Sequence, residues 1–136
     1  MNQLTENPEL RFVLLFHQYS PGDERADHWD LMLEHEGQLL TWALSEELAP
    51  GKNIVAKALD DHRIEYLDYE GEISNDRGSV SRVSSGAYRW KQHTVRHVAI
   101  LDKENENETW EVEFSPFDGE GICVSVSSGS KLSAFS

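Results

Sequence analysis

Short runs of strand-forming residues recur along the whole chain, and their close spacing constrains the fold more than any other feature of the sequence. Runs of β-branched, aromatic and aliphatic side chains alternate with clusters of Gly, Pro, Ser, Asn and Asp. No stretch shows a clear hydrophobic period of 3.6 residues. Many short strands separated by turns predict an all-β fold, and we expect a small closed antiparallel β-barrel with short helical turns.

The same pattern indicates a single domain. We expect residues 1–9 to be a flexible lead-in, residues 10–127 to form the domain, and residues 128–136 to be a frayed tail. The expected strands are 11–17, 28–34, 38–44, 54–59, 79–84, 87–93, 95–102, 109–114 and 121–127. Glu36-Gly37 predicts a tight turn that joins two of them in a hairpin, and residues 60–62 predict a corner.

The charge of the chain limits its binding partners. The net charge is −13, which argues against broad binding to nucleic acid through a basic surface. Residues 102–120 hold eight acidic side chains and one lysine, more than half of the net charge. The remaining surface is therefore mildly acidic and leaves room for a local site for one phosphate. The acidic segment itself is a candidate surface for a protein partner.

Several features predict a cytoplasmic location. No run of eighteen or more apolar residues is present, so we expect no membrane span. The first ten residues lack the pattern of a secretory signal. Cys123 is the sole cysteine, which rules out an intrachain disulfide and fits a reducing compartment.

The strand HWDLMLE, residues 28–34, contains the sharpest candidate for chemistry. Strand alternation places Trp29, Leu31 and Leu33 on the face that builds the core. It places His28, Asp30 and Met32 together on the other face. Cα atoms two residues apart on a strand are separated by roughly 6.5–7 Å, so the imidazole and the carboxylate can share one ion. His17, at the end of the preceding strand, is a candidate third ligand.

Two readings of this group remain open from the residues alone. Two imidazoles and a carboxylate suit Mn²⁺, Zn²⁺ or Fe²⁺ and leave positions for water or substrate. The alternative is a hydrogen-bonded surface pair. His62 and Tyr66 are further candidates for a site, or else aromatic residues packed at a barrel rim. His93 and His97 have the pattern of surface strand residues, and no nucleophile-elbow or phosphate-loop motif occurs.

Three motifs in order resemble a known family. RFVLLFH, HWDLMLE and DHRIEYLDYEG, at residues 11–17, 28–34 and 61–71, resemble the 3′-phosphoesterase domain of bacterial DNA ligase D. The resemblance covers residues 10 to about 90. It implies a small closed β-barrel that uses Mn²⁺ to remove a terminal ribonucleoside and a 3′-phosphate from DNA or primer ends.

The resemblance also implies roles for individual residues. His17, His28 and Asp30 match metal ligands, His62 matches a histidine that contacts the scissile phosphate, and Tyr66 matches a tyrosine of the same site. Mn²⁺, or another divalent transition metal such as Zn²⁺, is the implied cofactor, and DNA 3′ ends are the implied partner.

The chain departs from the family pattern at two positions of these motifs, lacks the arginine that precedes the His62 motif in the family, and has a longer loop between His17 and His28. Met32 stands where the family has an arginine that faces the phosphate, and Leu15 stands where it has a glutamine. Losing one arginine that stabilises the phosphate charge lowers the rate roughly 10²–10³-fold. The candidates to replace it from another strand are Arg63, Arg77 and Arg82. The activity could instead be lost, leaving a metal-binding or anion-binding module, or it could be directed at a small phosphomonoester.

Overall fold

The computed structural model describes residues 9–104 and 106–130, and within them it is built almost entirely of antiparallel strands. The strands are β1 (Leu10–Gln18), β2 (His28–His35), β3 (Gln38–Leu44), β4 (Asn53–Arg63), β5 (Gly71–Glu72), β6 (Ser79–His93), β7 (His97–Lys103), β8 (Glu108–Ser115) and β9 (Ile122–Ser130). One 3₁₀ turn, η2 (Ile64–Leu67), follows β4. The expected all-β class with short helical turns is confirmed.

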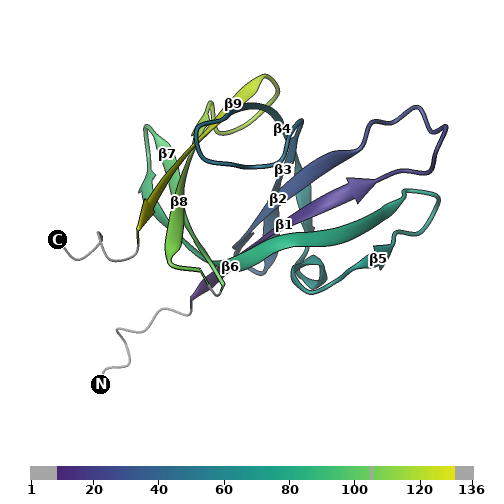
Figure 1. Cartoon of the computed structure of the whole chain (residues 1–136), viewed down its shortest axis with the longest axis horizontal. Helices are drawn as coiled ribbons and strands as arrows, with labels where there is room; N and C mark the ends of the chain where they lie inside the picture. The colour runs from purple at the N-terminus through teal and green to yellow at the C-terminus, as the bar shows by residue number, and fades with distance from the viewer. Residues whose placement is uncertain (1–8, 105, 131–136) are drawn as a thin grey trace.

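The strands form a closed ring. The order along the sheet is β1-β2-β3-β4-β9-β8-β7-β6-β5, and β1 also pairs with β6. Each strand from β1 to β4 and from β6 to β9 is therefore hydrogen-bonded on both sides, and the short β5 pairs with the first residues of β6 (Figure 1). Closure leaves these strands with few free backbone groups.

The inside of the ring holds the main core. Alternate residues of the ring strands β1–β4 and β6–β9 point inward, including Leu31 and Leu33 of β2, which are fully buried. The indole of Trp42 lies among them and donates a hydrogen bond to the carbonyl oxygen of Phe117 at 3.1 Å. The expectation that Leu31 and Leu33 build the core is met.

A second apolar cluster lies on the opposite face of β1, β2 and β3. We call it the outer cluster; its buried members are Val13, Leu15, Met32, Leu39, Leu67 and Val80. Because these strand residues alternate with the inward-facing ones, they project to the outside of the ring. Leu67 of η2 is buried against them. The outer face of HWDLMLE is therefore partly a core, which the sequence did not reveal.

Two expected strand boundaries were wrong. β4 continues through residues 60–62, where a corner was expected, and residues 79–93 form one strand instead of two. The Ser84-Ser85-Gly86 segment resembles a turn, but it lies where β6 is flanked by β1 and β7. A Cβ on Gly86 would stand 2.0 Å from the carbonyl oxygen of Asp102, so only glycine fits the close approach of the two backbones.

The hairpin turn has the expected backbone, whereas the last strand extends further than expected. Glu36 and Gly37 have φ values of 51° and 80°, as in the two-residue turn expected for the hairpin. β9 includes residues 128–130, which were assigned to the tail. Residues 1–8 of the expected lead-in and residues 131–136 of the expected tail lie outside the described residues. Within the described ranges, no helix has the length and apolar character needed to cross a membrane.

Candidate functional site

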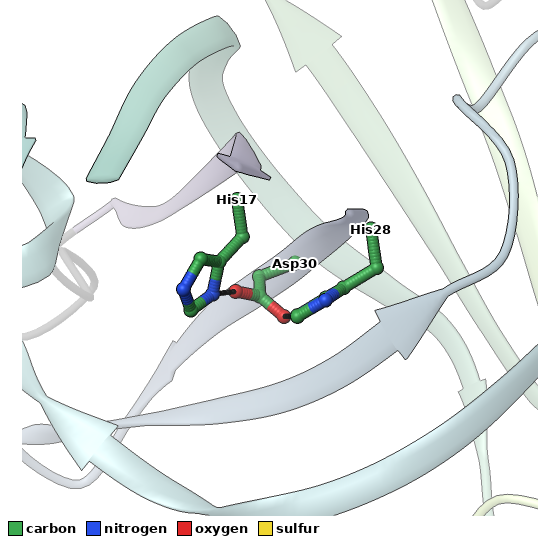
Figure 2. A group of neighbouring side chains, drawn as sticks. All are labelled: His17, His28 and Asp30. Carbon is green, nitrogen blue, oxygen red and sulfur yellow. Dashed lines mark hydrogen bonds and ion pairs between the residues drawn. The ribbon is translucent and has the colours of Figure 1, made fainter. Parts of the chain in front are cut away.

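His17, His28 and Asp30 meet at one point on the outer face of β1 and β2. His17 is directly opposite His28 in the register of the two antiparallel strands, and Asp30 is two residues further along β2. Nδ1 of His17 lies 3.3 Å from Oδ2 of Asp30, and Nε2 of His28 lies 3.0 Å from Oδ1. Figure 2 shows the carboxylate between the two imidazole rings. One nitrogen or oxygen of each residue lies within 4.8 Å of the others.

Backbone carbonyls fix the orientation of both imidazoles. Nε2 of His17 lies 2.6 Å from the carbonyl oxygen of Arg77, and Nδ1 of His28 lies 3.3 Å from that of Ala26. A carbonyl only accepts, so these ring nitrogens carry the protons. The other nitrogen of each ring then faces Asp30 with a lone pair or a second proton. This arrangement, with the far nitrogen held by the backbone, is typical of histidines that bind metals.

Burial makes a cation at this point favourable. The side chain of Asp30 is 4% exposed. Its Oδ1 has no hydrogen-bond partner among the described residues, even though Nε2 of His28 is close. A buried carboxylate oxygen without a donor is costly, and an ion bound between the three residues would satisfy it. The donor set, two imidazole nitrogens and a carboxylate, fits a divalent transition metal.

The pKa shifts of His28 and Asp30 also indicate that this point attracts positive charge. The contact with Asp30 raises the pKa of His28 above its ordinary value of 6.5, against the opposing effect of burial. Burial acts to raise the pKa of Asp30, but the contacts with His17 and His28 outweigh it and lower the pKa. The carboxylate is thus ionised and attracts positive charge.

An aromatic stack supports the first imidazole. Tyr19 lies against His17 with ring centroids 4.6 Å apart and an interplanar angle of 23°. The guanidinium of Arg25 lies 4.5 Å from the centroid of the Tyr19 ring. Asp23 binds that guanidinium in turn. The loop between β1 and β2 therefore packs beside the three residues and limits the motion of His17.

A pocket of about 390 Å³ opens beside this group. His17 and Asp30 line one part of it, and Met32, Ile73 and Val80 provide an apolar part. The remaining lining residues are polar or aromatic: Asp60, Asp61, His62, Arg63, Tyr66 and Arg77. Most of the sequence-predicted site residues therefore share one pocket. His28 and Arg82 do not line it; the backbone N–H of Arg82 donates to Glu70, and Arg82 pairs with Leu15 in the register of β6 and β1.

His62 reaches the pocket because β4 extends past the expected corner. It lies opposite Leu39 of the outer cluster, which places it on the outer face of the ring. Its Nδ1 lies 2.9 Å from the carbonyl oxygen of Asp60, so Nδ1 carries a proton and Nε2 is available for a ligand. Tyr66 of η2 packs edge-on against the imidazole, with ring centroids 5.9 Å apart.

The sequence did not identify several residues that contribute to the candidate site. The carbonyl of Arg77 orients His17 through its backbone, which leaves no side-chain pattern. Tyr19 could have been suspected only from its position two residues after His17. Asp60 and Asp61 were assigned to a corner, although they line the pocket.

Several carboxylates of the acidic segment 102–120 form ion pairs, which its sequence does not indicate. Glu111 pairs with Lys91, and Glu113 pairs with Arg96. Lys103 lies over the ring of Trp110, with its nitrogen 3.9 Å from the centroid, and also pairs with Glu106. Cations of neighbouring strands thus neutralise part of this face. A protein partner at this face stays a prediction.

Comparison with known proteins identifies the family. The model of the DNA ligase D 3′-phosphoesterase domain matches residues 21–117, which include His28, Asp30, His62 and Tyr66 but not His17. The chain is 32% identical over 69 residues to the multifunctional non-homologous end joining protein LigD of Mycobacterium bovis. The LigD repair protein of Mycobacterium tuberculosis gives the same identity over the same length. The match covers 47% of this chain and 9% of each mycobacterial protein. Since the family model covers well over half of the sequence, the chain belongs to the DNA ligase D 3′-phosphoesterase domain family.

Proposed function

We propose that this chain is a divalent-metal-dependent phosphoesterase that processes the 3′ ends of DNA or primer strands in repair. The convergence of His17, His28 and Asp30 beside a pocket that also contains two arginines carries the proposal. The family description supports the 3′-phosphoester substrate, and the names of the mycobacterial relatives support end joining. We propose Mn²⁺ as the cofactor, with Zn²⁺ as the alternative, and we retain the cytoplasm as the predicted location.

Each ligand is supported by its surroundings. The Arg77 carbonyl and Tyr19 hold His17, and the Ala26 carbonyl holds His28. Asp30 supplies negative charge from a buried position. A bound divalent ion would polarise a phosphate oxygen and make a coordinated water more acidic.

The remaining pocket residues would bind and orient the phosphate. Nε2 of His62 would contact a phosphate oxygen or hold a proton for transfer, because its Nδ1 is already engaged by Asp60. Tyr66 fixes the plane of that ring. Arg63 and Arg77 line the pocket, and their guanidinium groups would stabilise the charge on the phosphate oxygens.

The charge of the pocket links phosphate binding to the metal. Three carboxylates line it, those of Asp30, Asp60 and Asp61, against the two arginines. Without an ion the balance is negative, and a phosphate is repelled. A divalent ion reverses the sign. We therefore expect the anion to bind only after the metal.

The test is removal of a 3′-phosphate from a primer–template in Mn²⁺. We expect turnover by the wild-type chain, and a fall of about 10³-fold or more in His28→Ala and Asp30→Asn. Arg63→Ala should lose about 10²-fold, as expected for one charge-stabilising group. Arg89→Ala is the matched control, because Arg89 is an exposed arginine of β6 outside the pocket. Absence of turnover by the wild type, or equal turnover by His28→Ala, contradicts the proposal.

The apolar part of the pocket favours a second candidate. Met32 and Leu15 belong to the outer cluster, so the wall beside Asp30 offers hydrocarbon contacts instead of a cation. A module that binds metal and anion without turnover would fit this wall. Calorimetry would separate the two: the module predicts binding of inorganic phosphate in Mn²⁺ with no release of phosphate from the primer. A panel of small phosphomonoesters would reveal a smaller substrate.

A further inference from the structure

A second pair of histidines lies at the opposite end of β6 from the pocket. His93 ends β6, His97 begins β7, and the two residues face each other across the hairpin. Thr94 donates its backbone N–H to the carbonyl oxygen of Arg96 at 3.2 Å, which holds the connecting turn. The two side chains are brought together by the backbone register and not by a flexible loop.

Aromatic side chains hold both imidazoles. Trp90 is stacked on His93, with centroids 4.0 Å apart and an interplanar angle of 10°. Phe117 is stacked on His97, with centroids 4.3 Å apart and an angle of 23°. The two imidazoles are close to perpendicular, at 80°, with centroids 4.9 Å apart. Each ring is therefore supported on one face, and the pair is organised before any ligand binds.

The facing nitrogens of the two imidazoles lie at hydrogen-bond distance. Nδ1 of His93 lies 2.9 Å from Nδ1 of His97. Two lone pairs repel at this separation, so in the metal-free protein one nitrogen donates its N–H to the other, and a metal ion would replace that proton. Neither Nε2 has a partner among the described residues, and both can carry the ring proton when Nδ1 binds a ligand.

The separation also indicates a coordination angle. Metal–imidazole bonds are about 2.0–2.1 Å long. Two such bonds at 90° place the nitrogens about 2.9 Å apart, whereas a tetrahedral angle places them about 3.3–3.4 Å apart. The observed 2.9 Å is the distance of the hydrogen bond between the two nitrogens, and a square-planar or tetragonal ion would take up adjacent ligands at the same separation. Such geometry is preferred by Cu²⁺ and Ni²⁺ over Zn²⁺.

We propose that His93 and His97 form a second metal site, which binds Cu²⁺ or Ni²⁺ through both Nδ1 atoms in adjacent coordination positions. The remaining positions face solvent, because His93 is exposed and His97 is half-buried. This site shares no residue with the group of His17, His28 and Asp30 and does not depend on the proposed phosphoesterase function.

The charged surroundings do not oppose this binding. Burial, with the nearby His97 and His35, lowers the pKa of His93. Arg96 is held by both oxygens of Glu113, and Lys91 by Glu111. The cations closest in sequence to the pair are thus offset by carboxylates.

The experiment uses the untagged full-length chain carrying His28→Ala, so that the first site is removed. We expect this protein to bind one Cu²⁺, with electron paramagnetic resonance showing coupling to two imidazole nitrogens. His93→Gln and His97→Gln should each weaken binding at least tenfold. His35→Gln is the matched control on the neighbouring imidazole and should change the affinity less than twofold. Ni²⁺ should bind more tightly than Zn²⁺.

Several outcomes would overturn the proposal. Coupling of the bound Cu²⁺ to fewer than two imidazole nitrogens in the parent protein would overturn it without any further variant. Equal affinities for Cu²⁺ in His93→Gln and in the parent would also overturn it. Tighter binding of Zn²⁺ than of Ni²⁺ would overturn it too. Urea unfolding of each variant checks that the hairpin is intact, and we expect midpoints close to the parent because both side chains reach the surface.

Discussion

Binding of Mn²⁺ at His17, His28 and Asp30 should stabilise the folded chain. The three ligand groups come from two strands and are close together only after β1 and β2 have paired. An ion that binds the folded state alone shifts the unfolding equilibrium by mass action. The ion would also satisfy Oδ1 of Asp30, which is buried without a hydrogen bond.

The size of the effect follows from the ion concentration. At one hundred times the dissociation constant, a site present only in the folded state adds about 2.7 kcal/mol. For a chain of 136 residues, 1 kcal/mol corresponds to a change of about 3–4 °C in Tm. We therefore expect a rise of about 8–11 °C between metal-free and metal-saturated protein.

Differential scanning calorimetry with Mn²⁺ from zero to saturation is the assay. His28→Ala should abolish the rise, because one ligand is missing. His35→Ala supplies the control: His35 ends the same strand, its side chain is 41% exposed, and its one ion pair among the described residues is with the neighbouring Glu36. It should retain the full rise. A Tm independent of Mn²⁺ in the wild type, or the same rise in His28→Ala, would refute the reasoning.

Three further predictions concern pH and packing. The raised pKa of His28 means that its proton stabilises the metal-free fold below the unfolded value of 6.5, and that this contribution is lost as pH rises through the folded pKa. Calorimetry should accordingly show the Mn²⁺-dependent rise growing from pH 6 to pH 8, since the ion competes with that proton. Met32→Ala should lower the free energy of unfolding in urea by about 2–4 kcal/mol, because Met32 is 1% exposed, while Met32→Leu should cost less than about 1.5 kcal/mol. Gly86→Ala should destabilise by about 2 kcal/mol or more because its Cβ would meet backbone at 2.0 Å, whereas Gly129→Ala, with its nearest atom at 3.7 Å, should be tolerated.

The fold class and the meeting of His28 with Asp30 could be predicted because both follow from strand alternation. The period of two fixes which side chains of a strand share a face, and turn residues divide the chain into strands. The position of His17 came from the order of the motifs. The structure adds that His17 and His28 are direct neighbours in the register of β1 and β2.

Other features depended on contacts between distant strands. The continuity of β6 through Gly86 reflects the approach of the β7 backbone, which no local pattern encodes. The outer cluster was missed because a strand of a small barrel is expected to be apolar on one face only. Leu15 and Met32 depart from the family pattern, and both are buried in the outer cluster with Leu67 of η2 and Val80.

The position of that cluster bears on the chemistry of the site. Leu15 is directly opposite Asp30 in the register of β1 and β2, and Val13 is opposite Met32. Asp30 is therefore flanked by buried apolar residues of the outer cluster, while its carboxylate contacts the two imidazoles. In such surroundings a bare charge is penalised more heavily, and its attraction to a bound cation is stronger. Leu15 and Met32 would thus lower the affinity for phosphate and raise the affinity for the metal. This is why we expect the metal affinity of this chain to be retained even where its rate of phosphate release is low.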